Sequence, residues 1–337
     1  MDSLLDPLVL MANFILVPGL AYGCQLALGA LGVTMIYAVL NFSNFSHGEI
    51  MSFGTMATIL TTYGLQAAGV SLAPLPTALL ALPVGIVAAV GLCLLIDRFV
   101  FRFYRAQNAT SVTYLIVSIG VMFVTGGIIR FIIGPNDRSF QDGARFIFSA
   151  RDFKSWSGLG EGLALKTSQG ITILTTIIAV TAIFWFLNRT RTGKSMRAYA
   201  DNRDLALLSG IDPDRVVRIT WIVTAVLATV AGTLYGLDKS YKPMVYLHLV
   251  LPIFAAAIVG GVGNPVGAVA GGFIIAFSEL FVTFGYKKVA AYLFGAGVFG
   301  DGLLQMLSTD YKLAVSFMIL VIVLLVKPTG MFGGKTI

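Results

Sequence analysis

Charge is scarce in this sequence. Only 12% of the 337 residues are Asp, Glu, Lys or Arg, whereas 57% are hydrophobic. Soluble domains usually carry about 25% charged residues, so this composition excludes an ordinary soluble protein. There are only two cysteines, Cys24 and Cys93, and both stand inside apolar runs. We expect them to be small buried side chains rather than metal ligands.

Sequence motifs for catalysis are also missing. The phosphate-binding pattern G-x-x-x-x-G-K-[ST] does not occur, and GGVGNPVG at 260–267 lacks its Lys-Ser/Thr ending. We interpret these glycines as a site of close helix packing or a helix break. We therefore expect no enzymatic activity, no metal and no cofactor. The net charge of +7 does not indicate nucleic-acid binding, because the basic residues lie in loops beside helix ends.

Long uncharged runs are abundant, and they determine the fold class. A helix of about 20 apolar residues crosses the hydrocarbon core, whereas a β-barrel alternates apolar and polar residues over segments of about 10. Residues 7–48, 50–96, 106–129, 167–188, 219–237 and 243–278 contain no Asp, Glu, Lys or Arg. The sequence predicts an all-α, polytopic membrane protein, one transmembrane domain over 1–337 with about eight to ten crossings. Expected helices cover about 12–39, 50–69, 74–96, 109–131, 169–188, 218–237, 247–262, 265–284 and 313–326, with short or partly inserted helices at 287–308.

Lys and Arg in the loops predict the orientation. Residues 97–107 carry three arginines and one aspartate, and residues 189–218 carry seven basic and four acidic residues. We expect both loops and the C-terminus to be cytoplasmic, and the balanced segment 134–166 to be periplasmic. Asp2 and Asp6 stand where a signal peptide would carry basic residues. The first apolar run is therefore expected to be a retained membrane helix. Counting crossings places the N-terminus outside, and a broken helix near 41–49 would reverse that.

Polar side chains at membrane depth are the candidates for a solute pathway. The densest group is Asn41, Ser43, Asn44, Ser46, His47 and Glu49. Closely spaced Asn and Ser disfavour a continuous helix, and a broken helix could bind an amino acid through its helix ends. An ordinary connecting loop is the alternative. His47 could form a structural hydrogen bond or a proton-linked pair with Glu49, and Glu279 could face a partner, a packing interface or the pore.

The charged loop at 189–218, which we call the coupling loop, has a helical pattern. Met196, Tyr199, Arg203 and Leu207 recur at spacings of three to four, which predicts a helix over 195–209 ended by Gly210. Such a helix could insert apolar side chains into a groove of a cytoplasmic partner. From the residues alone, a solvated loop that only fixes topology is the favoured alternative.

Several segments carry a family resemblance. Residues 189–236 are similar to the cytoplasmic loop and following helix of bacterial ABC-importer permeases of the branched-chain amino acid type. Three further segments resemble that family in the same order: NFSNFSHGEIMSFGTMA (41–57), IFAAAIVGGVGNPVGAVAGGFIIAFSE (253–279) and LAVSFMILVIVLLVKPTGMFG (313–333). His47-Gly48-Glu49 resembles a motif that, in this family, belongs to the first of the two paired permeases. Asp204-Leu205 replaces the family's Glu-Ala, and Pro252 stands where a polar residue is more common.

The resemblance implies a permease subunit of an ATP-driven importer in the bacterial inner membrane. Its implied partners are a second permease, two ATP-binding subunits and a periplasmic binding protein that delivers a branched-chain or related amino acid. The residues implied for ATPase coupling are Arg197, Tyr199, Asp204, Ala206 and Gly210. Permeases for urea or short amides resemble the same family. Two alternatives come from other classes of membrane protein: an ion-coupled secondary transporter and a scaffold without a pore.

Overall fold

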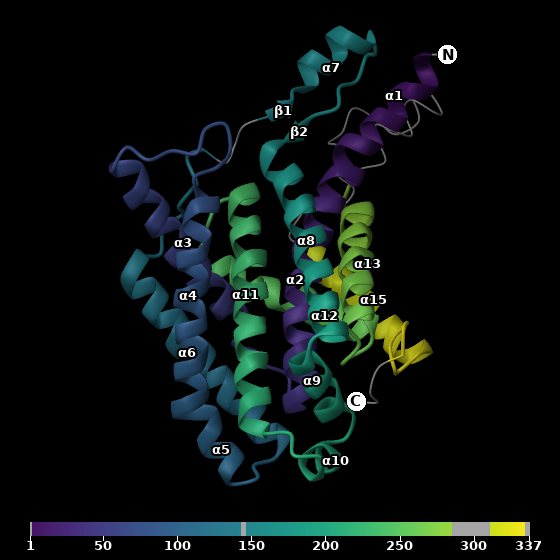
Figure 1. Cartoon of the computed structure of the whole chain (residues 1–337). Helices are drawn as coiled ribbons and strands as arrows, with labels where there is room; N and C mark the ends of the chain where they lie inside the picture. The colour runs from purple at the N-terminus through teal and green to yellow at the C-terminus, as the bar shows by residue number, and fades with distance from the viewer. Residues whose placement is uncertain (1, 143–145, 285–310, 334–337) are drawn as a thin grey trace.

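The computed structural model describes residues 2–142, 146–284 and 311–333, and most of these residues are helical (Figure 1). The long helices are α2 (Val17–Leu40), α3 (His47–Ala67), α4 (Ala78–Ile96), α6 (Ser111–Ile133), α8 (Thr167–Arg189), α11 (Pro213–Lys239), α12 (Pro243–Gly260), α13 (Pro265–Thr283) and α15 (Lys312–Val326). The short elements are α1 (Asp2–Met11), the π-helical turns η1 (Ala12–Leu16) and η2 (Asp97–Phe101), α5 (Arg102–Ala106), β1 (Phe146–Phe148), α7 (Ala150–Ser157), β2 (Leu165–Lys166), α9 (Arg191–Asp201) and α10 (Arg203–Leu208).

Seven helices in the described ranges are long and apolar enough to cross a membrane. α3 is too polar to be among them, and α15 is shorter, yet both pack against the long helices. The prediction of an all-α polytopic membrane protein is therefore confirmed. Two helix boundaries were wrong, because the first span begins at Leu5 rather than at residue 12, and the expected loop 97–107 stays helical to Ala106. The segment predicted at 287–308 lies outside the described residues.

α2 is the central helix of the bundle. In its most apolar stretch 94% of the residues are buried, against 17% in α8, which places α8 at the periphery. Glycines bring α13 close to α2: a Cβ at Gly23 would stand 2.5 Å from the ring of Phe273, and one at Gly19 would stand 2.6 Å from Phe277. Small residues allow this close approach because helices in lipid associate largely through packing.

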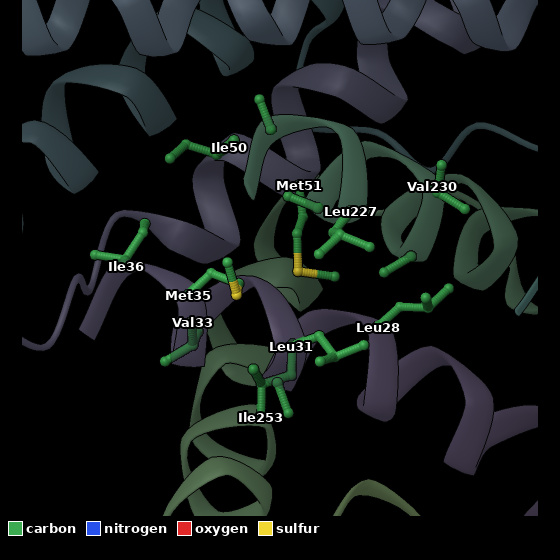
Figure 2. Packing of buried hydrophobic residues seen from close by; sticks show 14 of the residues in the cluster. Leu28, Leu31, Val33, Met35, Ile36, Ile50, Met51, Leu227, Val230 and Ile253 are labelled. Atoms are coloured by element: carbon green, nitrogen blue, oxygen red, sulfur yellow. The ribbon is translucent and has the colours of Figure 1, made fainter. Parts of the chain in front are cut away.

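The core between α2, α3, α11 and α12 is filled with apolar side chains (Figure 2). The helices contribute Leu28 and Leu31 from α2, Ile50 and Met51 from α3, Leu227 and Val230 from α11, and Ile253 from α12. The cavity that these four helices enclose has a volume of about 10 Å³. That volume holds one water molecule at most, so this part of the described core is tightly packed.

The glycine-rich segment at 260–267 joins α12 to α13. A Cβ at Gly260 would stand 2.0 Å from the backbone oxygen of Gly267, and one at Gly271 would stand 2.0 Å from that of Ala256. Asn264 caps α13, because its Oδ1 accepts hydrogen bonds from the N–H groups of Val266 and Gly267 at 3.0 and 3.2 Å. The interpretation of these glycines as helix packing beside a helix boundary is confirmed.

The loops fall at two ends of the bundle (Figure 1). α5, α9 and α10 share one end, which we call the coupling end, and the last described residues lie near it. α1, β1, α7 and β2 gather at the opposite end. The two most basic loops therefore share one end, as the distribution of Lys and Arg predicts.

The segment at 134–166 is structured and tied to its surroundings. β1 and β2 form a two-stranded antiparallel sheet, and α7 lies between them. Lys242 pairs with Asp137 at 2.5 Å, and the N–H of Glu161 donates to Asp6 Oδ1 at 3.2 Å. These contacts hold the segment against α1 and the start of α12.

Candidate functional site

The polar segment between α2 and α3 reverses the direction of the chain. Asn41 adopts the left-handed conformation, with φ 55° and ψ 36°, which asparagine tolerates better than most residues. α3 then returns to the α7 end, where the Tyr63 hydroxyl donates to the backbone oxygen of Ser139 at 2.9 Å. The expected interruption is present. It is a turn between two antiparallel helices, however, and not two halves of one crossing, because Asn41 ends α2 and redirects the backbone.

Hydrogen bonds inside the segment position the first turn of α3. Asn44 Oδ1 accepts from the N–H of Ser46 at 3.2 Å and from its Oγ at 2.7 Å. The N–H of Phe45 donates to Ser118 Oγ of α6 at 3.2 Å. The polar side chains therefore satisfy the backbone of the turn, which is the usual role of Asn and Ser at a helix start.

α3 begins well inside the bundle. A Cβ at Gly32 would stand 2.7 Å from the imidazole of His47, and Gly32 lies eight residues before the end of α2. At 1.5 Å per residue, the start of α3 is about 12 Å from the end of α2. His47 is fully buried, and neither ring nitrogen has a hydrogen-bond partner of ordinary geometry among the described residues.

Burial separates the six predicted pathway residues. Asn41 is exposed, and Ser43 is half-buried. The other four are at most 4% exposed: Asn44, Ser46, His47 and Glu49. The structure brings these four residues together at the start of α3, beside the apolar core. A direct contact between them and a moving solute therefore stays a prediction.

Arg130 lies beside Glu49, which the sequence did not indicate. A Cβ added to Gly126 would lie 2.9 Å from Arg130 Nη2 and 3.1 Å from Glu49 Oε1, so both side chains reach the same place beside Gly126. Arg130 also donates from Nε to the backbone oxygen of Gly126 at 2.9 Å and from Nη1 to Met244 Sδ at 3.3 Å. Its place near a helix end had suggested only a side chain that reaches for the membrane surface. No spacing rule links residues 49, 130 and 244, so tertiary packing alone reveals this group.

Glu279 has partners within the chain. Glu279 is 1% exposed, Ser316 Oγ of α15 donates to its Oε1, and the Tyr22 side chain of α2 lies close to the carboxyl group. The carboxyl group therefore helps to hold α13 against α2 and α15. Among the alternatives that the sequence left open, this arrangement favours helix packing.

The coupling loop contains two helices, whereas the sequence predicted one helix over 195–209. Asn202 interrupts it with φ −148° and ψ 109°, and its Oδ1 accepts from the N–H of Leu205 at 3.0 Å. Thr190 caps the first helix in the same way, accepting from the N–H of Gly193 at 3.0 Å. Asparagine caps a new helix readily, which is why the expected continuous helix was wrong.

The apolar side chains of the coupling loop face two ways. Met196, Tyr199 and Ala206 are 1%, 6% and 3% exposed, so they anchor the loop on its own bundle. Leu205, Leu207 and Leu208 are 61%, 45% and 85% exposed. The expectation that Met196 and Tyr199 enter a partner is therefore wrong, because the chain's own core covers them. Three leucines are exposed instead.

The other residues predicted for coupling remain at the surface. Arg197 and Asp204 are exposed, and Gly210 is exposed with φ 78°. A Cβ at Gly210 would meet nothing within 4 Å. A larger side chain there would therefore project away from the bundle.

A pocket at the coupling end connects this loop with the turn. Its volume is about 640 Å³, and its lining includes Asn41, Arg102, Arg105, Tyr199 and Arg203. Arg203 Nη2 donates to the backbone oxygen of Val39 at 3.1 Å. The start of α10 is thus bonded directly to the last turn of α2, next to Asn41.

A second polar contact fixes the helices around this pocket. Asp97 accepts two hydrogen bonds from Arg105, at 2.5 and 3.1 Å, and one from Trp221 Nε1 at 2.9 Å. The three side chains come from η2, α5 and α11. They tie the segment 97–106 to the helix that leaves the coupling loop.

These features define the class of the protein. It is a polytopic helical membrane protein with a structured helical loop at one end of the bundle. The sequence profile of the family described as branched-chain amino acid transport system / permease component matches residues 15–324. The chain belongs to this family.

Individual relatives cover nearly the whole chain. It is 29% identical over 323 residues to the high-affinity branched-chain amino acid transport system permease protein LivH of Salmonella typhimurium, covering 94% of this chain and 93% of the relative. It is 27% identical to BraD of Pseudomonas aeruginosa, covering 94% of each chain. The probable branched-chain amino acid transport permease protein LivH of Methanocaldococcus jannaschii is 30% identical, covering 95% and 92%.

Proposed function

We propose that this chain is one of two permease subunits of an ATP-driven importer of branched-chain amino acids. In this proposal a periplasmic binding protein delivers the solute, and two ATP-binding subunits drive its movement across the inner membrane. The observation that carries the proposal is the coupling loop. It holds three exposed leucines at the end of the bundle that carries the most basic loops.

The coupling loop is suited to transmit force. Its buried side chains Met196, Tyr199 and Ala206 fix it to the bundle. A partner that binds the exposed Leu205, Leu207 and Leu208 would therefore contact an element that is held rigidly on the bundle. Exposed apolar side chains of this size typically enter a pocket on a protein partner.

Motion of the loop has a direct route to the turn. Arg203 is bonded to the backbone oxygen of Val39, and the guanidinium lies 5.2 Å from the centre of the Tyr199 ring. A displacement of α10 would therefore pull the end of α2, where the chain turns into α3. The proposed consequence is a shift of the buried polar residues at the start of α3.

The orientation follows from charge. We assign the coupling end, which carries the basic loops, to the cytoplasm, and we expect the C-terminus on the same side. The opposite end, with α1, β1, α7 and β2, is assigned to the periplasm. The binding protein would dock on that side.

A pair of glycine substitutions tests the proposal. Gly210 and Gly69 both have φ 78°, and a Cβ at either meets nothing within 4 Å. Gly69 follows α3 at the α7 end, so Gly69→Leu is a matched control that carries the same backbone strain of about 1–2 kcal/mol. We expect Gly210→Leu to abolish co-purification of the ATP-binding subunits and ATP-dependent leucine uptake, and Gly69→Leu to preserve both.

Two outcomes would count against the proposal. Uptake by the chain in proteoliposomes without an ATP-binding subunit would indicate a secondary transporter. A binding protein from the same system that binds urea and no branched-chain amino acid would indicate the urea alternative. The family and the names of the relatives favour the amino-acid importer over both.

A further inference from the structure

The inference concerns where the solute contacts this chain, and it rests on the proposed function. Apolar side chains fill the core between α2, α3, α11 and α12 (Figure 2). A cavity lined by residues of these four helices has a volume of about 10 Å³. That cavity is too small for a branched-chain amino acid. A pathway along an outer face of the chain, completed by the second permease subunit of the proposed importer, avoids this packed core.

The first turns of α12 lie beside the start of α3. A Cβ at Gly48 would stand 2.5 Å from the backbone oxygen of Tyr246 and 2.4 Å from Val250 Cγ2, so these residues flank the start of α3. The start of α3 lies beside Gly32, in the interior of α2. Residues 246–250 are therefore well inside the bundle along its length, and His248 stands between them with an exposed side chain.

Polar groups continue from His248 across the adjoining face of α6. His248 Nδ1 donates to the backbone oxygen of Met244 at 3.1 Å, because a carbonyl can only accept. Met244 Sδ in turn lies 3.3 Å from Arg130 Nη1. We call Arg130, Met244 and His248 the polar face.

The Arg130 guanidinium has unused donors. Among the described residues it forms no salt bridge, and its two hydrogen bonds go to a backbone oxygen and to a thioether, which is a weak acceptor. Glu49 is close behind it and 4% exposed. This arrangement orients the guanidinium and leaves N–H groups available to a carboxylate.

The other outer faces differ in chemistry. Phe123, Val124 and Phe131 of α6, and Leu174 and Ile177 of α8, are between 59% and 92% exposed, which suits lipid. An arginine and a histidine on a lipid-facing surface would each be costly at this depth. The polar face is therefore expected to meet water or protein.

We propose that the polar face borders the solute pathway and that Arg130 binds the carboxylate of the passing amino acid. The planar guanidinium matches a carboxylate with two parallel N–H···O bonds. Glu49 is a positioning residue, which holds Arg130 by its charge. His248 offers its second ring nitrogen, Nε2, to water or to the solute.

Cysteine labelling in the assembled importer tests the location. Both native cysteines are buried, so they give a low background. Met244→Cys and His248→Cys are compared with Phe123→Cys and Leu174→Cys, using a small, charged, membrane-impermeant thiosulfonate reagent. We expect the two polar-face cysteines to react at least about tenfold faster than the controls and to be protected during turnover with leucine. Equal rates at all four positions would refute the location.

Substitution of Arg130 tests the role. Removing a charged hydrogen-bond donor typically weakens an interaction by at least about tenfold. We expect Arg130→Gln to lower the maximal rate of leucine uptake by that factor, with ATP-binding subunits still attached, and Arg130→Lys to restore part of it. Unchanged uptake in Arg130→Gln would refute carboxylate binding. If this variant does not assemble, the labelling rates alone decide.

Failure of the proposed function and failure of the pathway assignment give different results. If the unmodified complex shows no ATP-dependent uptake of branched-chain amino acids, the proposed function fails. If it transports normally while residues 244 and 248 label like the lipid-facing controls, only the pathway assignment fails.

Discussion

Replacing Asn44 with leucine tests how strongly the turn between α2 and α3 depends on one amide. Asn44 is 1% exposed, and its Oδ1 accepts from both the N–H and the Oγ of Ser46. Leucine has a similar volume but offers no acceptor. The first turn of α3 would lose the bonds that position it, and with them the placement of Glu49 near Arg130.

The magnitude follows from these two bonds. A neutral hydrogen bond contributes about 0.5–1.5 kcal/mol net, and a buried donor left without a partner costs about 1–3 kcal/mol. We therefore expect Asn44→Leu to lower the free energy of unfolding by about 2–4 kcal/mol. The Nδ2 group of Asn44 has no partner among the described residues, so its removal relieves one buried unpaired donor and moves the expected loss toward the lower end of this range.

Unfolding in mixed SDS micelles measures this free energy, and uptake in proteoliposomes measures the consequence. The control is Asn44→Asp, which keeps the Oδ1 acceptor at a helix N-terminus, where a negative charge is tolerated. We expect uptake to fall at least about tenfold in Asn44→Leu, with the complex intact, and less in Asn44→Asp. Normal uptake and stability in Asn44→Leu would refute the role assigned to the turn.

Three further predictions concern helix packing and coupling. Asp97→Ala removes the acceptor of a buried ion pair, and we expect a loss of about 3–5 kcal/mol in SDS unfolding. Gly232→Ala would place a Cβ 2.8 Å from the backbone oxygen of residue 51, so we expect a loss of about 1–3 kcal/mol, whereas Gly127→Ala, with nothing within 4 Å, should not destabilise. Arg203→Ala removes the bond to Val39, and we expect less leucine transported per ATP hydrolysed while the ATP-binding subunits still co-purify.

The polar residues at 41–49 indicate a helix interruption, but they do not indicate its three-dimensional form. Asn41, Asn44 and Ser46 indicate correctly that no helix runs through them, because their side chains compete for backbone hydrogen bonds. They do not reveal that the chain reverses, or that four of the six polar side chains are buried. Burial depends on α6, α11 and α12, which are distant in sequence.

The coupling loop shows a similar division. Its charge and its helical spacing predict a structured element, and Gly210 ends the second helix with a positive φ as expected. The same spacing assigned Met196 and Tyr199 to a partner, because periodicity identifies an apolar face without identifying what covers it. The bundle covers that face and leaves Leu208 exposed instead.

The sequence by itself determined that this is a polytopic helical membrane protein, where its main interruption lies and which family it belongs to. Length of apolar runs, charge in loops and motif order are local properties, so they can be read along the chain. Only the tertiary structure decided which polar groups meet. Glu49, Arg130 and Met244 come from three helices, and their proximity depends on glycines that let those helices approach, such as Gly48 and Gly126. No spacing in the sequence encodes such a contact.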